Sequence, residues 1–299
     1  MTAMEPLVTI VTPSLNQGRF IRETIDSVLG QTYPAIEYLV VDGGSTDDTL
    51  EILRQYGNRV RWVSEPDRGQ AGAINKGWRS GRGSIVAYLN SDDTYLPLAV
   101  ERAVACFARD PSAGAVYGEG YHVDELGRIL DRYPTEPFSM DRLEETCFIC
   151  QPTVFLRREL VERVGYLDES LQYSLDYDLW IRAARVARFA FTPHYLATTR
   201  LHAETKTFGQ RVAVHAEIMR MVRHHFGYVA PSWAYAYAHA VLGPRDRSTR
   251  WRETRFVVSL LAISLYEFLR QNRRIPRVTW KRWAGWLRHG RSRVRGKSA

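Results

Sequence analysis

The chain has 299 residues, of which 45% are hydrophobic and 25% charged, values that are typical of a globular protein and exclude an intrinsically disordered one. Its net charge of +8 arises at one end: residues 243–299 hold 16 Lys and Arg against 3 Asp and Glu, a net charge of +13, whereas the first 242 residues hold 25 against 30, a net charge of −5. This distribution indicates a surface partner for the basic end and argues against a nucleic-acid-binding core.

Over the first 110 residues, apolar runs alternate with segments of helical periodicity. The predicted strands are 7–11, 36–41, 60–63 and 85–89, and the predicted helices start near Phe20, Ser45, Ala71 and Pro97. Ser45, with Asp48 three residues later, predicts a capping box for the second helix. Four successive strand–helix units favour a doubly wound, mostly parallel sheet of the Rossmann-like α/β class.

The pattern is less regular after residue 110. We predict a hairpin over 115–130, a loop rich in Pro and acidic residues over 134–145, and helices near 176–186 and 211–226. Beyond Pro231 the composition shifts to Trp, Tyr and Arg. The sequence therefore predicts a domain of residues 1–230 and a basic, aromatic, helical extension of residues 231–299.

Polar residues follow each predicted strand. In an open parallel sheet, ligands bind at the carboxyl ends of the strands, so these residues are the first candidates for a site. The carboxylate of Asp42 can accept hydrogen bonds from a ribose hydroxyl or a base N–H, and Gly43 allows a ligand close to the backbone. Because Ser45 and Asp48 already account for the helix start, we favour ligand binding by Asp42 over a turn-forming role.

Asp92 and Asp93 are adjacent acids directly after the fourth strand. Two neighbouring carboxylates repel each other unless a cation or protons lie between them. Mg²⁺ takes one or two protein carboxylates and completes its shell with water and substrate phosphates. The pattern predicts a divalent-cation site for a diphosphate, and two solvated turn acids are the alternative.

Four segments, in this order, resemble those of the family 2 glycosyltransferases of GT-A fold. They are 9–16 (TIVTPSLN), 40–47 (VVDGGSTD), 89–93 (LNSDD) and 176–180 (DYDLW). The resemblance covers residues 6–208. It implies a GT-A fold in which residues 1–110 bind a nucleotide sugar and residues 111–230 bind the acceptor.

The resemblance also implies the residues of the donor site. The nucleotide sugar would contact Pro13, Ser14, Asn16, Asp42, Gly43, Asp67, Gln70, Asn90, Ser91 and Asp92. Asp92, Asp93 and His202 would hold Mg²⁺ or Mn²⁺. Asn90 stands where many relatives carry an acid, so here it would only hydrogen-bond to the sugar or the diphosphate.

On the acceptor or diphosphate side, the resemblance places Gln151, Trp180, Arg200 and Lys206, the last two as cations that neutralise phosphate charge. Asp176 would be the base that takes the proton of the attacking hydroxyl. Asp178 would cap the helix or pair with an arginine. The alternatives are a helix cap for Asp176, the core for Trp180, a surface loop for His202 and a loop-to-strand junction for Gln151.

These features together indicate an inverting, metal-dependent transferase. It would move a sugar from a UDP- or dTDP-sugar to an acceptor hydroxyl on a glycan or a lipid-linked acceptor, in the synthesis of cell-surface polysaccharide, O-antigen or glycolipid. A nucleotidyltransferase would need a loop rich in Gly and Arg after the first strand, where residues 12–20 have only Gly18 and Arg19. A nucleotide-sugar-binding scaffold without turnover is the second alternative.

The basic end carries Trp280, Trp283 and Trp286 at helical spacing among Lys and Arg, as in a helix that lies in a membrane interface. Packing of this helix on the domain is the alternative. The apolar run 256–266 is about half the length that spans a bilayer. With three cysteines, too few for a disulfide framework, we expect a cytoplasmic protein, peripheral on the inner face of the cell membrane, with no nucleic-acid partner.

Overall fold

The computed structural model describes residues 5–202, 209–244 and 250–273. These residues form two compact units, each described by itself: residues 5–143 with 147–202, and residues 144–146 with 209–244 and 250–273. The boundary predicted at Pro231 lies inside the second unit, and the roles assigned to the two sides of that boundary stay predictions. Lys206 and the predicted helix around Trp280 to Trp286 lie outside the described residues.

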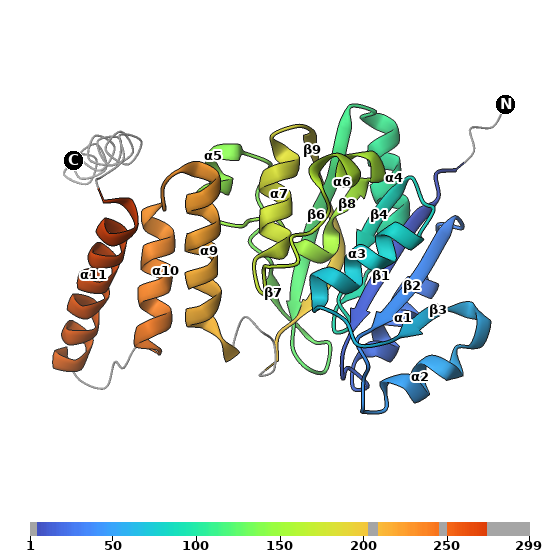
Figure 1. The fold of residues 1–299 in the computed structure, drawn as a ribbon, viewed down its shortest axis with the longest axis horizontal. Coiled ribbons are helices and arrows are strands. Elements are labelled where there is room, and N and C mark those ends of the chain that lie inside the picture. Colours follow the sequence, from blue (N-terminus) through green and yellow to red (C-terminus); the bar gives the residue numbers. More distant parts are fainter. Residues whose placement is uncertain (1–4, 203–208, 245–249, 274–299) are drawn as a thin grey trace, which may run out of the picture. The chain divides into compact units, whose positions relative to one another are not determined.

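The first unit is built on one nine-stranded sheet, as the α/β prediction required (Figure 1). Its strands are β1 (Val8–Ser14), β2 (Ile36–Asp42), β3 (Arg61–Ser64), β4 (Ile85–Tyr88), β5 (Thr94–Tyr95), β6 (Ala113–Val123), β7 (Ile129–Arg132), β8 (Phe155–Arg157) and β9 (Arg188–Arg200). Their spatial order is β3-β2-β1-β4-β8-β6-β9-β5, and β7 pairs with β6. The first four strands in this order pair in parallel, as do β6 and β9.

The antiparallel pairs all involve β5, β7 or β8. β6 and β7 form the predicted hairpin. The strands β5 and β9 were not predicted, and a strand after Gln151, where β8 lies, was only the alternative. The two residues of β5 show no periodicity that distinguishes a strand from a loop. β5 and β8 make the half of the sheet beyond β4 mixed.

Helices cover both faces of the sheet. They are α1 (Ile21–Leu29), α2 (Thr49–Gln55), α3 (Gln70–Ser80), α4 (Ala99–Arg109), α5 (Met140–Leu143), α6 (Arg158–Val164) and α7 (Leu175–Ala184), with 3₁₀ turns η1 (Gly57–Arg59) and η2 (Gln151–Thr153). α1, α2 and α4 share one core with Ile10 of β1. α3 packs so close to the neighbouring Val11 that a Cβ on Gly77 would lie 2.5 Å from it. Because adjacent strand residues point to opposite faces, the arrangement is doubly wound.

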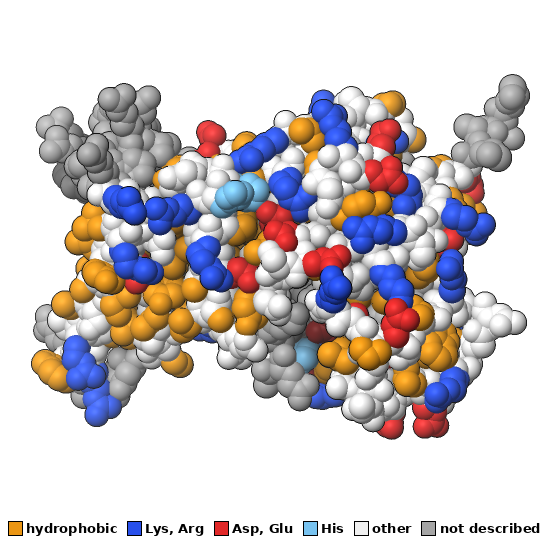
Figure 2. Space-filling model, viewed as in Figure 1, with side chains coloured by type: hydrophobic (Ala, Val, Ile, Leu, Met, Phe, Trp, Pro, Cys, Tyr) orange, Lys and Arg blue, Asp and Glu red, His pale blue; other side chains and the backbone are white. Residues whose placement is uncertain are grey.

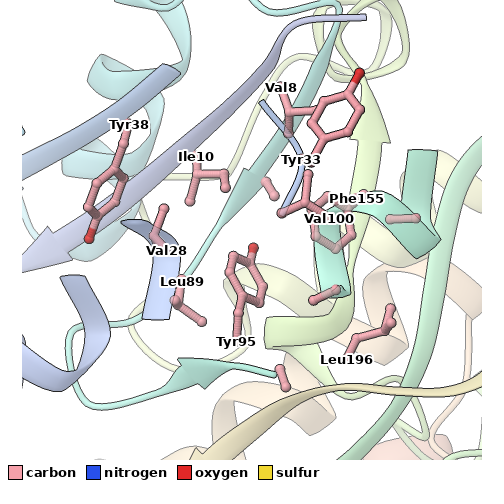
Figure 3. Packing of buried hydrophobic residues seen from close by; sticks show 14 of the residues in the cluster. Val8, Ile10, Val28, Tyr33, Tyr38, Leu89, Tyr95, Val100, Phe155 and Leu196 are labelled. Atoms are coloured by element: carbon pink, nitrogen blue, oxygen red, sulfur yellow. The ribbon is translucent and has the colours of Figure 1, made fainter. Parts of the chain in front are cut away.

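The core between β1, β2, β4 and their helices is continuous with the second half of the sheet. Val8 lies beside Tyr33, and Ile10 and Leu89 lie nearer Tyr95 (Figure 3). The ring of Tyr95 stacks on Phe155 of β8, with the centroids 5.6 Å apart. Dense packing of this kind leaves the strands little freedom to shift. The loops at the carboxyl ends of the strands therefore start from a fixed edge.

The start of α2 differs from the prediction. Its N-cap residue, Asp48, makes no capping hydrogen bond, and the Thr49 N–H donates to Asp47 Oδ1 at 3.0 Å. The hydroxyl of Ser45 donates instead to the carboxylate of Asp42. The predicted capping box is wrong because a buried carboxylate, which needs donors, takes the serine.

The second unit is helical, with α9 (Arg211–Phe226), α10 (Pro231–Leu242) and α11 (Arg250–Asn272). The side chain of Asn272 ties α11 to the α9–α10 connection: it accepts the Val229 N–H at 2.8 Å and donates to the Val229 carbonyl at 3.0 Å. The prediction of a helical extension is thus confirmed for the described part. No helix among these residues is long and apolar enough to span a bilayer.

Candidate active site

The predicted site residues of the first unit lie at strand ends, in the loops beyond them, or at helix starts. β1 ends with Pro13 and Ser14, β2 ends with Asp42, and the loops after β1, β2 and β3 contain Asn16, Gly43 and Asp67, respectively. The connection from β4 to β5 contains Asn90, Ser91, Asp92 and Asp93, while α3 begins with Gln70 and η2 with Gln151. Helix α7 carries Asp176 and Trp180, and β9 ends with Arg200, which His202 follows. Hydrogen bonds join these segments into two groups.

The first group joins the ends of β1, β2 and β3. The Ser14 carbonyl accepts the Gly43 N–H at 2.8 Å. Asn16 adopts a left-handed backbone, φ 53°, and its side-chain oxygen accepts the Thr46 N–H at 2.8 Å. A Cβ on Gly43 would lie 2.9 Å from Asp67 Oδ2, so the carboxylate of Asp67 lies directly against this glycine. The loops after β1, β2 and β3 are therefore in direct contact with one another.

Asp42 organises this group from within. Its carboxylate is fully buried and accepts the N–H groups of Gly44 (3.1 Å) and Ser45 (2.9 Å) and the hydroxyls of Ser64 (2.6 Å) and Ser45. The prediction that Asp42 binds a ligand and does not stabilise the turn is therefore wrong, because its oxygens hold the loop together. The capacity to bind a ligand lies with its neighbours, because Asp67 is exposed and, within the described residues, the buried hydroxyl of Ser14 has no hydrogen-bond partner.

The second group is a chain of three amides. Gln70 Nε2 donates to Asn90 Oδ1 at 2.7 Å, Asn90 Nδ2 donates to Gln151 Oε1 at 3.1 Å, and Gln151 Nε2 donates to the Tyr88 carbonyl at 3.0 Å. The chain holds α3, the β4–β5 loop and η2 together. Asn90 both accepts and donates here, which an ionised carboxylate could not do. An ionised carboxylate at position 90 could therefore not complete this chain.

Asp92 and His202 form a close pair at the end of β4. Asp92 Oδ2 lies 3.0 Å from His202 Nε2, and the two side chains are 18% and 3% exposed. The imidazole ring also lies against Phe20, with the centroids 4.9 Å apart. His202 is buried, so the surface-loop alternative is wrong, and its role as a metal ligand stays a prediction.

Asp93 is turned away from this pair. It is buried, its Oδ1 accepts the Arg200 N–H at 2.9 Å, and its Oδ2 accepts Asn90 Nδ2 at 3.3 Å. Burial, and after it the charge of Asp92, raise the pKa of the Asp93 carboxyl well above its ordinary value. The prediction of Asp93 as a metal ligand is therefore corrected: its oxygens serve the scaffold. Across residues 5–202, 209–244 and 250–273, no three His, Cys, Asp or Glu side chains are grouped to hold a metal.

Arg200 is also part of the scaffold. Its side chain is 1% exposed, and its guanidinium donates to the carbonyls of Asp92 (2.9 Å) and Glu125 (2.8 Å) and to the carboxylate of Glu23. The prediction that it faces a phosphate is corrected, because these protein acceptors already engage it. Its backbone and side chain instead fix the β4–β5 loop.

Two scaffold residues on α1 were missed. Glu23 pairs with Arg200, and the Thr24 hydroxyl donates to the Asp93 carbonyl at 2.8 Å. Thr24 lies between Ile21 and Ile25 on the buried face of the helix. A polar residue at a core position of an amphipathic helix was the available signal, since a buried hydroxyl needs a partner. Glu23 offered no such signal in the sequence, because an acid is common in the first turn of any helix.

Asp176 lies half-buried in the first turn of α7, where its Oδ1 accepts the Tyr177 N–H at 2.8 Å. Burial raises the pKa of its carboxyl to about 6. Its charge adds to the effect of burial in raising the pKa of Tyr88 and of Cys147, so it lies within electrostatic reach of the last residue of β4.

The other α7 residues are structural. Asp178 is buried and pairs with Arg182 at 2.6 Å, one of the two roles predicted for it. Trp180 is 1% exposed and packs edge-on against Phe189. The core alternative for Trp180 is thus correct, and its role as an acceptor wall is not.

Comparisons to known proteins identify the family of this chain. The sequence model described as "Glycosyl transferase family 2" matches residues 9–165, more than half of the chain. The chain belongs to glycosyl transferase family 2. An uncharacterized glycosyltransferase of Rickettsia prowazekii is 32% identical over 68% of this chain and 66% of its own length, and the chondroitin synthase of Escherichia coli is 32% identical over 67% and 29%. The family 2 chain thus spans less than two thirds of these relatives.

Solved structures confirm the GT-A fold of this family 2 chain. Residues 1–349 of S. aureus TarS, in complex with UDP-GlcNAc, align with a TM-score of 0.62 at 18% identity, over 86% of this chain and 80% of that one. The mannosyltransferase PcManGT of Pyrobaculum calidifontis, in complex with GDP-Man and Mn²⁺, aligns with a TM-score of 0.60 at 21% identity, over 88% and 76%.

The role of Arg200 can be tested by Arg200→Lys. The substitution keeps the charge but cannot reach all of the acceptors, so we expect it to lower the free energy of unfolding in urea by about 3 kcal/mol. Arg128→Lys is the matched control: its side chain is 74% exposed beside Asp124, and we expect a change below about 0.5 kcal/mol. Unchanged stability of Arg200→Lys with weaker nucleotide binding would contradict the scaffold role.

Proposed function

We propose that this family 2 chain transfers a sugar from a nucleoside-diphosphate sugar to an acceptor hydroxyl with inversion at the anomeric carbon. The observation that carries the proposal is Asp176: a half-buried carboxylate in the first turn of α7, with a pKa raised to about 6. A carboxylate tuned toward neutral pH is suited to accept a proton during catalysis. A scaffold that only binds nucleotide sugars has no need of such a group.

The interlocked loops after β1, β2 and β3 support the donor site. Asp67 offers an exposed carboxylate to a base N–H or a ribose hydroxyl, and Ser14 offers a buried hydroxyl without a protein partner in the described structure. Pro13, Asn16, Asp42 and Gly43 would shape the pocket, and Gln70 and Asn90 would contact the sugar or the diphosphate. We propose a UDP- or dTDP-sugar as the donor.

The residues at the end of β4 fit a divalent cation. Asp92 and His202 place a carboxylate oxygen and an imidazole nitrogen 3.0 Å apart. Two protein ligands are an incomplete shell, of the kind that donor phosphates and water complete around Mg²⁺ or Mn²⁺. When bound, the cation would act as a Lewis acid on the leaving diphosphate.

The chain's own residues would perform the remaining steps. The acceptor oxygen attacks the anomeric carbon from the side opposite the diphosphate, while Asp176 takes the hydroxyl proton. The bond to the diphosphate breaks with its electron pair staying on the leaving oxygen. One displacement of this kind inverts the configuration, through a transition state of oxocarbenium character. Gln151, held by Asn90 and the Tyr88 carbonyl, would position the reacting groups.

The acceptor and the location belong to the same proposal. We propose a glycan or a lipid-linked acceptor, in cell-surface polysaccharide, O-antigen or glycolipid synthesis. A lipid-linked acceptor would place the protein at the inner face of the cell membrane, and the basic end of the chain suits that surface. Lys206 and the Trp-rich segment after Thr279 stay predictions within this scheme.

The first test replaces the base. Asp176→Asn removes the proton acceptor and keeps the shape, so we expect kcat to fall at least a hundredfold while the Kd for the nucleotide sugar stays within about twofold. Asp178→Asn, on the same helix, is the matched control: it breaks an ion pair with Arg182 and should lower stability more than kcat. Release of the nucleoside diphosphate from a panel of donors is the assay. Full activity of Asp176→Asn would remove Asp176 as the base.

The second test is the pH profile. The base acts in its ionised form, and burial raises the pKa of Asp176 to about 6. The rate should therefore be low below pH 6, rise through pH 6 and level off above about pH 7. A rate that rises instead around pH 4, the ordinary pKa of an aspartate, would contradict the assignment of Asp176 as the base.

The third test concerns the cation. With Mn²⁺ present, Asp92→Ala should weaken binding of the nucleoside diphosphate about tenfold or more, and with a chelator the variant and the wild type should bind alike. Glu159→Ala, which removes an exposed acid on α6, is the control and should behave as wild type in both conditions. Calorimetric titration separates these cases. A chelator that leaves wild-type turnover unchanged would exclude the metal.

A further inference from the structure

Helix α11 exposes a continuous apolar stripe. Trp251, Val258, Leu261, Leu265 and Leu269 are between 42% and 67% exposed. At 3.6 residues per turn these positions fall on one side of the helix. The opposite side packs inward, since Leu260, Glu267 and Gln271 are buried. Figure 2 shows hydrophobic side chains gathered over α10 and α11, with Lys and Arg among them.

Arginines border the stripe along one edge. Arg252, Arg255, Arg270 and the adjoining Arg273 are exposed, and the helical spacing aligns them. The two acids of α11 lie away from this edge: Glu267 is buried and pairs with Arg270, and Glu253 is half-buried. Within residues 250–273 the exposed surface of the helix therefore carries apolar groups and positive charge, and no exposed acid.

Three partners could cover this face of α11: residues 274–299, a second copy of the chain, or a lipid bilayer. The apolar and basic character of the face favours one of them. Residues 274–299 carry nine Lys and Arg and no acid, so they would meet the arginine row with like charge. A second copy of α11, placed face to face, would do the same. The surface of an anionic lipid bilayer offers apolar chains for the stripe and phosphates for the arginines.

We propose that α11 lies in the interface of an anionic lipid bilayer, with the stripe in the boundary between headgroups and acyl chains and the arginine row on lipid phosphates. The geometry is that of an interfacial helix and not of a spanning one. The anionic bilayer would be the surface to which the chain binds peripherally, and α11 the helix through which it binds. It does not depend on sugar transfer, because vesicle binding needs neither donor nor acceptor.

Flotation of the full chain with vesicles tests this proposal. Vesicles of phosphatidylcholine with phosphatidylglycerol are compared with vesicles of phosphatidylcholine alone. Leu261→Ser combined with Leu265→Ser removes the centre of the stripe, and we expect partition into the anionic vesicles to fall about tenfold or more. The control combines Leu126→Ser with Leu130→Ser, two leucines that are 73% and 56% exposed near the β6–β7 turn, and should bind as wild type.

The arginine row is tested separately. Arg252→Gln with Arg255→Gln should lower partition several-fold in dilute salt, and the difference from wild type should shrink as salt rises. Equal thermal midpoints of all variants show that they fold alike.

Three results would overturn the proposal. In the first, the wild type binds vesicles equally well with and without phosphatidylglycerol. In the second, the stripe variant and the control variant bind equally well. In the third, the wild type sediments as a dimer and the stripe variant as a monomer. The last result would assign the face to a second copy of the chain. Nucleoside diphosphate release, assayed on the same variants without vesicles, shows separately whether the proposed transfer holds.

Discussion

The buried guanidinium of Arg200 is the interaction on which the site depends. Removing a charged group from water is costly unless protein groups replace its hydration. Here the carbonyls of Asp92 and Glu125 and the carboxylate of Glu23 replace it, while the Arg200 N–H donates to Asp93. One residue at the end of β9 thereby links α1, the β4–β5 loop and the β6–β7 turn. The β4–β5 loop, which carries Asp92 and Asp93, is therefore held in place before any ligand binds.

This scaffold divides the work between adjacent acids. Asp93 and Asp42 are buried and accept hydrogen bonds from their own loops, whereas Asp92 and Asp67 keep accessible oxygens. A buried carboxylate stabilises a loop through the donors that it collects. A partly exposed one beside it can then bind a cation or a nucleotide without moving the backbone. Pre-organisation of this kind lowers the cost of ordering the site when the donor arrives.

The sequence predicted the layers of the fold and most of the loops that form the site, because helical and strand periodicities report which faces are buried. It could not assign the duty of each acid. Asp92 and Asp93 read alike in a sequence, and contacts from residues more than a hundred positions away separate their roles: the Arg200 N–H donates to Asp93, and His202 pairs with Asp92. The same holds for Asp42, whose donors include Ser64 on another strand. Trp180 could not be placed either, since core and stacking aromatics share one pattern.

The most direct measurement is a crystal structure of the full chain with UDP and Mn²⁺, in which anomalous scattering locates the metal. We expect the manganese peak within about 2.3 Å of Asp92 and His202, as for ordinary carboxylate and imidazole ligands, with the diphosphate beside it and Arg200 still buried. A peak on Asp93, or a phosphate oxygen hydrogen-bonded to the Arg200 guanidinium, would contradict the division between scaffold and ligands.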